Sequence, residues 1–419
     1  MKSKLFSKFL EFNTAHRLFS KKDKIILAFS GGPDSVCLAK LLLAFGIKPH
    51  LIHINFQLRP EAKSDEAFCR SFAIENQLSI NVRRFDTVTF AQKNKYSVEE
   101  AARILRYKEF EEERKRTTSD FIFTGHHAND NAETFLINFA AGTGIRGISG
   151  IKPISGKIIR PLLFAAKTEI LEFCNKNGLE YCIDKSNTDV RFVRNRIRAR
   201  VVPELQKINP AFLDTTKRTL EILSETEKLF LEIVESYKQK IVTHKNGKLY
   251  VEIKKLLEAT SPKTILFEIL RDYGFNYSLV SDILNSANSE PGKVFYSDKM
   301  VLLKDREYYI LSESPVEDFK KVITDKNDST LLSELNLSMT TSLGGDTHKL
   351  EFDKKSAFLD LDKIEFPLIY RSVESGDKFK PLGMTQNKLV SDFFIDNKYT
   401  YFQKKEARVL ESEGEILAI

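Results

Sequence analysis

A candidate phosphate-binding loop is formed by Ser30-Gly31-Gly32-Pro33-Asp34-Ser35. Its two glycines let backbone N–H groups approach a phosphate without a side chain in the way, and its two serine hydroxyls can donate to phosphate oxygens. Because a carboxylate does not favour a phosphate, we expect Asp34 to hold Mg²⁺ or to orient the loop. The Lys-Ser/Thr ending of a Walker loop is missing. The alternative is an ordinary strand–turn–helix corner with a good cap.

A second group of chemistry-bearing residues lies between positions 125 and 134. On a helix, His126, Asp130, Glu133 and Ile137 would share one face, so an imidazole and two carboxylates would point at the same place. Such a cluster can bind a metal or an ammonium group, or take a proton from an amine. A solvated helix face is the alternative. A zinc site is disfavoured, because the chain has no H-E-x-x-H motif and its cysteines are distant in sequence.

Two arginine-bearing segments extend this set. Arg103 and Arg106 lie in a helix-like stretch and could reach a carboxylate or a phosphate, although a solvated helix with Glu–Arg pairs is the alternative. Five arginines fall within residues 191–200, where Arg194 and Arg198 would line one side of a helix with Arg191. Arginine forks suit phosphate oxygens, and a charged surface helix is the other interpretation.

The elements that must position these residues are visible in the first half of the chain. Strand-like stretches at 24–30, 49–56, 79–85 and 121–124 alternate with helix-like stretches at 36–45, 64–77, 98–115 and 128–140. This alternation predicts parallel pairing in a doubly wound α/β sheet, whose ligand site lies at the carboxyl ends of the strands. Both candidate motifs fall at such strand ends.

The length of 419 residues predicts about three domains. We expect an α/β catalytic domain at 1–214, a mainly helical middle domain at 215–315, and a small α+β C-terminal domain at 330–419. A long amphipathic helix is predicted at 220–240, a polar linker near 317–328, and a helix near 388–397 within the strand-like C-terminal part.

Composition excludes several protein classes. The net charge of +7 permits a nucleic-acid partner without demanding one. The four cysteines are too sparse for a disulfide framework and are typical of reduced cytosolic thiols. The sequence has no run of about 18 apolar residues and no signal-peptide pattern, so we expect a cytoplasmic protein without a membrane span.

Several motifs, in order and at consistent spacing, resemble those of the PP-loop ATP pyrophosphatases, and specifically the tRNA(Ile)-lysidine synthase family. They are S-G-G-P-D-S at Ser30, E-E-A-A-R-I-L-R-Y at Glu99, H-H-A-N-D-N-A-E-T at His126, G-T-G-I-R-G-I-S-G at Gly142, R-P-L-L at Arg160, D-K-S-N-T-D at Asp184 and R-N-R-I-R at Arg194. Residues 371–381 and 388–396 resemble the C-terminal domain of the same family.

The resemblance implies a reaction. ATP adenylates the C2 oxygen of the wobble cytidine in an isoleucine tRNA with a CAU anticodon, and free L-lysine then displaces AMP to give lysidine. The residues fit its steps as follows: catalysis by Asp34, Asp130 and Glu133; ATP binding by Ser30, Gly31, Gly32, Pro33, Asp34, Ser35 and His126, with His127 as the alternative histidine; Mg²⁺ at Asp34; and lysine binding by Arg103, Asp130 and Glu133. We assign tRNA binding to Arg194, Arg198, Lys378, Lys380 and Lys388, because basic side chains suit tRNA phosphates; scattered solubilising lysines are the alternative for the last three.

Two other functions compete with this one. A PP-loop tRNA thiolase would need reactive cysteines, yet Cys174 and Cys182 are eight residues apart and offer no clear sulfur-carrying pair. A non-catalytic protein of the same fold that binds ATP or tRNA would not need carboxylates at positions 34, 130 and 133. The sequence leaves the oligomeric state, monomer or homodimer, open.

Overall fold

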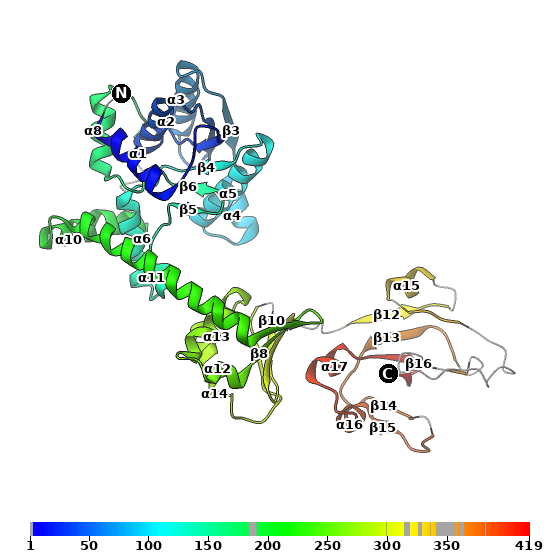
Figure 1. Ribbon diagram of the computed structural model, residues 1–419. Helices are drawn as coiled ribbons and strands as arrows, with labels where there is room; N and C mark the ends of the chain where they lie inside the picture. The colour runs from blue at the N-terminus through cyan, green and yellow to red at the C-terminus, as the bar shows by residue number, and fades with distance from the viewer. Residues whose placement is uncertain are drawn as a thin grey trace. The chain divides into compact units, whose positions relative to one another are not determined.

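A computed structural model describes residues 3–183, 190, 192–298, 300–313, 319–325, 329–335, 337–340, 357, 359–360, 364–381 and 383–419. The chain divides into two compact units, Met1–Leu231 and Glu232–Ile419 (Figure 1). The D-K-S-N-T-D motif and Arg191 lie outside the described residues.

The first unit alternates strands and helices, as the sequence predicts. Its elements are α1 (Lys4–His16), β1 (Ile25–Ala28), α2 (Pro33–Phe45), β2 (His50–Asn55), α3 (Ala62–Glu75), β3 (Ile80–Arg84), α4 (Thr87–Asn94), α5 (Val98–Arg116), β4 (Phe121–Phe123), α6 (Ala128–Ala140), α7 (Ile145–Ile148), β5 (Ile154–Ser155), β6 (Ile158–Ile159), α8 (Lys167–Lys176), α9 (Val193–Arg196), the π-helix η2 (Ile197–Val201), α10 (Val202–Ile208) and α11 (Phe212–Ile241), which continues into the second unit.

The strand order of this unit places the candidate motifs side by side. The sheet runs β3-β2-β1-β4-β6-β5, and all pairs are parallel except β5 with β6. The chain moves outward from β1 through β2 to β3 and then returns to β4 on the other side of β1. Ligands of open α/β sheets bind at such a switch point, beyond the carboxyl ends of the strands. The loops that leave β1 and β4 therefore meet there.

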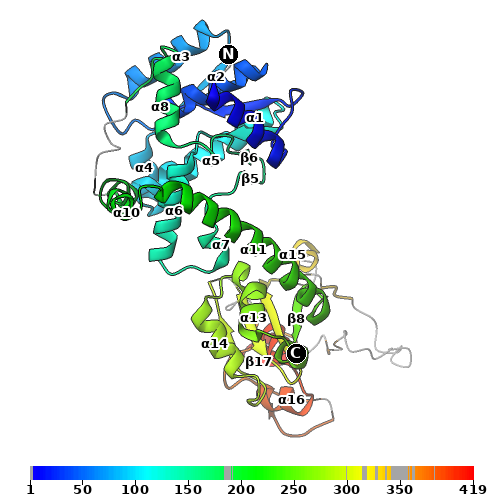
Figure 2. The same ribbon diagram turned by 60° about the vertical axis from the view of Figure 1, so that its left-hand side comes forward.

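Helices cover both faces of this sheet, which confirms the doubly wound α/β prediction. On one face, alternate residues Ile25 and Leu27 of β1 pack with side chains of α1, α2, α3 and α8. On the other face, Ile26 packs with Ile52, Ile122 and Phe110, the last from α5. Figure 2 shows the first unit with these helices labelled. Strands buried on both faces read as continuous apolar runs, which is why β1 was recognisable in the sequence.

A polar cluster joins α6 to the part of α11 that lies in the first unit. The Asn131 side chain of α6 accepts a hydrogen bond from the Ile151 backbone N–H (2.6 Å). Lys152 pairs with the buried Glu227 of α11, which also accepts a hydrogen bond from the Ser149 hydroxyl (2.5 Å). The turn at 149–152 thus holds the two helices in a fixed relation.

The second unit contains two sheets and several short helices. Its elements are β7 (Val242–Lys245), β8 (Lys248–Glu252), α12 (Ile253–Leu257), α13 (Pro262–Leu270), the 3-10 helix η3 (Arg271–Tyr273), α14 (Tyr277–Asn285), β9 (Val294–Tyr296), β10 (Met300–Lys304), β11 (Tyr308–Glu313), β12 (Lys320–Ile323), α15 (Ser329–Glu334), β13 (Leu368–Ser372), β14 (Lys378–Phe379), β15 (Lys388–Leu389), α16 (Val390–Asp396), α17 (Tyr401–Glu406), β16 (Arg408–Ser412) and β17 (Glu415–Ala418).

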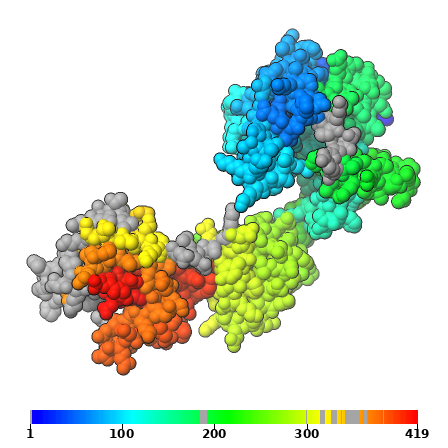
Figure 3. Space-filling model, turned by 180° about the vertical axis from the view of Figure 1, so that it is seen from behind, coloured from blue at the N-terminus to red at the C-terminus, as the bar shows by residue number. Residues whose placement is uncertain are grey.

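Helices occur in the middle of the chain as expected, but a five-stranded antiparallel sheet of order β7-β8-β11-β10-β9 accompanies them. The last part has a six-stranded sheet of order β12-β13-β16-β17-β14-β15 with helix α16 near the predicted position. Within the segment predicted as linker, residues 320–323 form β12 and pair with β13. Figure 3 shows one face of each unit in space-filling form, with the described residues coloured along the chain. Among the described helices, none has the length and apolar character needed to cross a membrane.

A buried carboxylate of α5 joins this helix to strands β2 and β3. The Glu113 side chain is 1% exposed and lies 2.6 Å from His50 Nε2, 2.8 Å from Asn81 Nδ2 and 2.6 Å from Arg116 Nη2. Burial alone would raise the pKa of Glu113, but the hydrogen bonds from Arg116, Asn81 and His50 lower it to about 2. Because the folded pKa lies below the unfolded value near 4.5, this carboxylate stabilises the fold above pH 4.5 and ceases to do so as the pH falls toward 2.

We expect Glu113→Gln to lower the free energy of unfolding by about 2 kcal/mol at pH 7, because it removes the charge that these donors stabilise. The difference from the wild type should shrink between pH 4.5 and pH 2. Urea denaturation across this pH range measures both effects. Glu111→Gln is the matched control, since Glu111 lies on the same helix and pairs with Arg114 at 2.7 Å but is 39% exposed. Equal losses in the two variants would contradict the prediction.

Candidate active site

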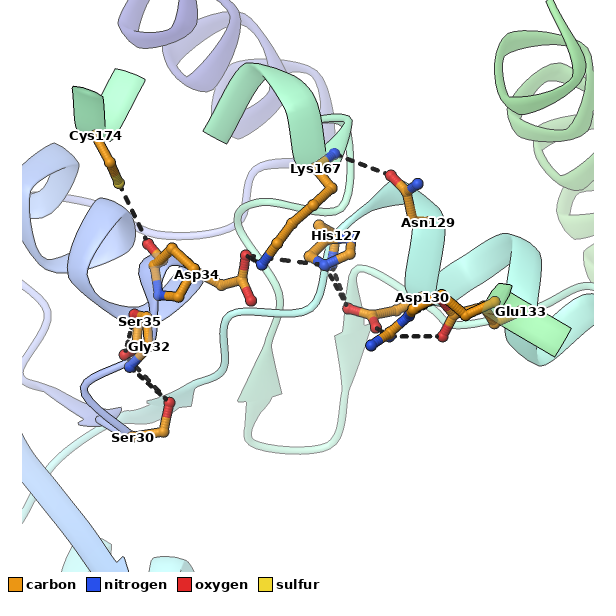
Figure 4. A network of polar contacts seen from close by, with 12 residues as sticks. Ser30, Gly32, Asp34, Ser35, His127, Asn129, Asp130, Glu133, Lys167 and Cys174 are labelled. Carbon is orange, nitrogen blue, oxygen red and sulfur yellow. Dashed lines mark hydrogen bonds and ion pairs between the residues drawn. The ribbon is translucent and has the colours of Figure 1, made fainter. Parts of the chain in front are cut away.

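The candidate phosphate loop has the predicted position, between the end of β1 and the start of α2. Gly31 adopts φ +81°, and Gly32 is the extended N-cap residue of α2. The Ser30 hydroxyl accepts the Gly32 N–H (3.3 Å), and the Ser35 hydroxyl donates to the Gly32 carbonyl (2.9 Å). These hydrogen bonds fix the two serine side chains against the Gly32 backbone, next to the N-terminus of α2 (Figure 4). A helix N-terminus with such a loop is suited to bind phosphate groups.

Gly31 is packed so closely that an added side chain would press on three neighbouring side chains. A Cβ at this position would lie 3.1 Å from Cys69 Sγ, 3.1 Å from the Phe68 ring and 3.2 Å from Cys182 Sγ. The Gly31 carbonyl also accepts the Cys182 N–H at 2.9 Å. Residues that are distant in sequence therefore pack against this loop and fix its conformation.

The loop after β4 approaches the phosphate loop from the other side. A Cβ at Gly125 would lie 3.2 Å from Asp34 Cβ, so this glycine allows the close contact. His126 does not lie on the helix as predicted, since α6 begins at Ala128 and His126 Nδ1 lies 2.8 Å from Thr124 Oγ1. Burial lowers the pKa of His126 to about 4, which makes it a neutral ring at pH 7.

His127, at the N-cap of α6, lies between two carboxylates. Its Nε2 atom is 3.8 Å from Asp34 Oδ1 and 3.5 Å from Asp130 Oδ2. The Asp130 carboxylate also accepts the His127 backbone N–H (3.0 Å). Burial alone would raise the pKa of Asp130, but the charges of His127 and His126 and this hydrogen bond hold it below its usual range. His127 Nδ1 is buried and has no hydrogen-bond partner in the described part of the chain.

Lys167 is a site residue that the sequence analysis did not identify. It is the first residue of α8, and its Nζ lies 2.5 Å from Asp34 Oδ1 (Figure 4). Its backbone N–H donates to Asn129 Oδ1 at 2.9 Å. The only available signal was a lysine at a helix start shortly after the R-P-L-L motif, and its partner is 133 residues away.

The two predicted carboxylates of α6 share one face, but a guanidinium already occupies it. Arg198 Nε and Nη2 donate to Glu133 Oε1 and Oε2 at 2.6 Å and 2.9 Å, and Arg198 Nη2 lies 3.5 Å from Asp130 Oδ1. Arg194 Nη2 donates to Thr134 Oγ1 at 2.7 Å. Glu133 is almost fully buried. This pair of carboxylates thus binds a planar cation in the structure.

A further group of arginines lies on and near α5. The Arg103 guanidinium stacks on the Tyr107 ring at 5.0 Å, and Arg106 stacks on Phe56 at 5.3 Å. Burial lowers the pKa of Arg106 and of Arg160, and both interact electrostatically with Arg103. The structure brings Arg103 into contact with Tyr107 and shows no ion pair from it to the carboxylates of α6 within the described residues.

The three lysines predicted to bind tRNA belong to the second unit. Lys378 and Lys380 are exposed on and after β14. Lys388 is half-buried and pairs with Asp396 of α16. Nearby, the buried Arg371 donates to both carboxylate oxygens of Asp377 (2.9 and 3.0 Å) and holds the turn that leads to β14. Among the described residues, Lys378 and Lys380 have no ion-pair partner, whereas Asp396 neutralises Lys388.

Comparison with known proteins gives consistent matches over most of the chain. The PP-loop domain family matches residues 1–205, and the TilS substrate binding domain family matches residues 244–314. A tRNA(Ile)-lysidine synthase of Parabacteroides distasonis is 36% identical over 403 residues, which cover 96% of this chain and 91% of the relative. One from Bacteroides thetaiotaomicron is 33% identical, with 94% and 89% covered. A solved U34-tRNA thiolase, NcsA from Methanococcus maripaludis, has a TM-score of 0.45 at 18% identity, covering 53% of this chain and 79% of that chain.

We expect Gly31→Ala to weaken ATP binding at least about tenfold, because the added methyl group presses on Cys69, Phe68 and Cys182, and a shift of the loop by a few tenths of an ångström would misplace its phosphate donors. Gly178→Ala is the matched control: Gly178 also has positive φ (+59°), but nothing lies within 4 Å of its added Cβ. Both variants should lose about 1 kcal/mol of stability from backbone strain. Nucleotide titration and urea denaturation measure the two effects. Equal ATP affinity in the two variants would disprove the close-packing argument.

Proposed function

The chain belongs to the tRNA(Ile)-lysidine synthase family, and we propose that it ligates free L-lysine to C2 of the wobble cytidine of the CAU-anticodon isoleucine tRNA. The cytidine is first adenylated by ATP with release of pyrophosphate, and AMP leaves when lysine attacks. The observation that carries this proposal is the juxtaposition of the phosphate loop with the carboxylates of α6 across the β1–β4 switch point. We further propose that the reaction occurs in the cytoplasm.

The phosphate loop is assigned to ATP. Ser30, Gly31, Gly32, Pro33 and Ser35 surround the position in front of the N-terminus of α2, where backbone donors and hydroxyls suit the β- and γ-phosphates. His126 is assigned to the same substrate, because a buried neutral imidazole can contact a base or ribose without bringing a charge.

Asp34 is assigned to Mg²⁺ that arrives with the nucleotide. Within the described residues, no group of three or more His, Cys, Asp or Glu side chains could hold a metal ion by itself. This fits Mg²⁺, which is commonly held by one or two carboxylates together with substrate phosphates. Asp34 offers a hard carboxylate oxygen beside the loop, at 28% side-chain exposure. When bound, the ion offsets the negative charge of the phosphates.

Asp130 and Glu133 are assigned to the substrate lysine. The ion pair that Arg198 forms with these carboxylates supports this role, because carboxylates that bind a guanidinium can also bind an ammonium group. The lysine amine must lose a proton before it attacks C2, and Asp130 is the more accessible acceptor, with 14% of its side chain exposed against 2% for Glu133. Arg103 is assigned to the α-carboxylate of lysine.

Arg194 and Arg198 are assigned to tRNA phosphates. Both are 39% exposed, so each can exchange its carboxylate or hydroxyl partner for a phosphate oxygen. In this mechanism Arg198 leaves Glu133 when tRNA binds, and the lysine ammonium takes its place. We propose the same three-part division as from the sequence: catalysis in 1–214, and tRNA contacts in 215–315 and 330–419.

The thiolase alternative is not favoured. The two thiols packed against Gly31 are poor nucleophiles, because burial raises the pKa of Cys69 and raises that of Cys182 to about 12. Cys37 and Cys174 are both buried, and Cys174 Sγ lies 3.6 Å from the Pro33 carbonyl oxygen.

Incubation of unmodified isoleucine tRNA with the enzyme, ATP, Mg²⁺ and lysine tests the proposed reaction. The anticodon cytidine should gain the mass of one lysine less one water, and a methionine tRNA should gain nothing. ATP cleavage to AMP without this gain would point to another acceptor or nucleophile. Absence of both would favour a non-catalytic binding protein.

We expect Asp130→Asn to keep ATP affinity within about threefold while raising the KM for lysine or lowering kcat by at least about 100-fold, because the amine loses its proton acceptor and counter-charge. Steady-state kinetics with lysine as the varied substrate, together with nucleotide titration, measure this. The assignment fails if the lysine kinetics are unchanged.

Reversing two charges of the second unit tests its tRNA contacts. Lys378→Glu/Lys380→Glu should weaken tRNA binding at least about tenfold and reduce the salt dependence of binding by about two charges, while ATP affinity stays unchanged. Lys388→Gln should have a smaller effect, because Asp396 already neutralises Lys388. Filter binding at several salt concentrations measures these changes, and unaltered affinity in the double variant would exclude the contact.

A further inference from the structure

The phosphate loop of this chain lacks a lysine of its own, yet a lysine from elsewhere reaches it. Walker loops carry a lysine that contacts the leaving phosphates, whereas Ser30–Ser35 contains no basic residue. Lys167 Nζ lies at 2.5 Å from the only charged side chain of this loop, Asp34. A cation is therefore already present at the edge of the loop, and it comes from the start of α8.

The backbone at Lys167 is held in place by the loop that follows β4. The Lys167 N–H donates to Asn129 Oδ1 (2.9 Å), and the Ala128 N–H donates to the Ala165 carbonyl (2.9 Å). The start of α8 is therefore fixed beside the start of α6. The ion pair itself is partly exposed to solvent, with 33% of the Lys167 side chain and 28% of the Asp34 side chain accessible, so water can solvate either partner when the pair separates.

We propose that Lys167 is a catalytic residue that leaves Asp34 when ATP binds and places its ammonium group on the leaving pyrophosphate. This inference rests on the proposed adenylation. In that step the cytidine C2 oxygen bonds to the α-phosphorus while the bond from the α-phosphorus to the bridging oxygen breaks. The electron pair of the broken bond goes to that oxygen, which departs with pyrophosphate. A compact ammonium charge with three donors suits the negative charge that develops there.

The geometry also explains why the lysine starts on Asp34. An ion pair with about a third of each side chain exposed contributes little stability, so little is lost when the ammonium moves. Until ATP arrives, the pair keeps Lys167 extended toward the loop. Asp34 is then available to the nucleotide-bound metal once the lysine has turned to the phosphates.

Lys167→Met, with Lys8→Met as its matched control, tests the proposal. Lys8 Nζ pairs with Glu169 Oε1 of the same helix at 2.6 Å, with 40% and 31% of the two side chains exposed, but not with the loop. We expect Lys167→Met to slow tRNA-dependent pyrophosphate release about 100-fold in single turnover, with ATP affinity changed less than about threefold. Lys8→Met should stay within about twofold of the wild type. Lys167→Arg should recover part of the rate, since it keeps the charge.

Direct binding of pyrophosphate, measured by calorimetry, gives a second readout that needs no turnover. Lys167→Met should bind pyrophosphate about tenfold more weakly than the wild type or Lys8→Met, and AMP equally well. If Lys167 only positions Asp34, pyrophosphate affinity will not change in Lys167→Met. That result, or a rate in Lys167→Met within threefold of the wild type, overturns the inference. Lys167→Gln replaces Lys167→Met if urea denaturation shows that the latter is unstable.

These outcomes separate the inference from the proposed function. A wild-type enzyme that releases pyrophosphate but attaches no lysine to tRNA would refute the assigned nucleophile and leave the role of Lys167 to be decided by the same comparison. A wild-type enzyme that releases no pyrophosphate would refute the adenylation, while the calorimetric comparison would still decide whether Lys167 contacts pyrophosphate.

Discussion

The parallel pairing of β1 with β4 is the constraint on which the site depends. Ile25, Ile26 and Leu27 pair in register with residues 121–123, so the two strands end at the same level. The loop after one strand must then pass directly over the loop after the other. Gly125 makes this passage possible, because any side chain there would meet Asp34. The register of the two strands and the absence of a side chain at Gly125 therefore bring the candidate phosphate loop close to the carboxylates of α6.

Acidic and basic side chains alternate across this site. Lys167 lies beside Asp34, the His127 ring lies between Asp34 and Asp130, and Arg198 faces Asp130 and Glu133. Like charges at this spacing repel, and Lys167 and Arg198 place a positive charge beside the acidic groups. In the proposed mechanism, the ammonium group of the substrate lysine therefore takes the position that Arg198 occupies in the structure.

Local patterns predicted the fold of the first unit well. The strands appear as short apolar runs, and the loop after β1 follows from glycine and serine chemistry. Contacts between distant segments were not predictable in this way. Arg198 was placed on tRNA because five arginines occur together, whereas its partner Glu133 is 65 residues earlier in the chain. For Lys167 the local signal was weak, a lysine at a helix start after the R-P-L-L motif, and its partner Asp34 is 133 residues earlier in the chain. His126 was misplaced because the N-cap is one residue later than the spacing suggested.

The second unit shows a different limit of sequence interpretation. Strands β7 to β11 are three to six residues long and are interrupted by helices α12 to α14, whose apolar content dominates the pattern. Only β8, which alternates buried and half-buried residues, carries a clear period of two. Here antiparallel pairing across long sequence distances, rather than local preference, produces the sheet.

The polar cluster around Asn131 has a consequence for where the site can adapt. Asn131 lies between Asp130 and Glu133 in the sequence of α6, and its side chain accepts a hydrogen bond from the Ile151 backbone N–H. The neighbouring Gly150 has no room for a side chain, because a Cβ there would lie 2.3 Å from Asn131 Oδ1. Any rotation of α6 would break this hydrogen bond, so the helix holds Asp130 and Glu133 in a fixed orientation. In the proposed mechanism, adjustment to the substrates then falls to the basic side chains: Arg198 lies in a π-helical turn, and Lys167 reaches Asp34 from the start of α8. The acidic half of the site is held by a backbone hydrogen bond, and the basic half carries the side chains that this mechanism moves.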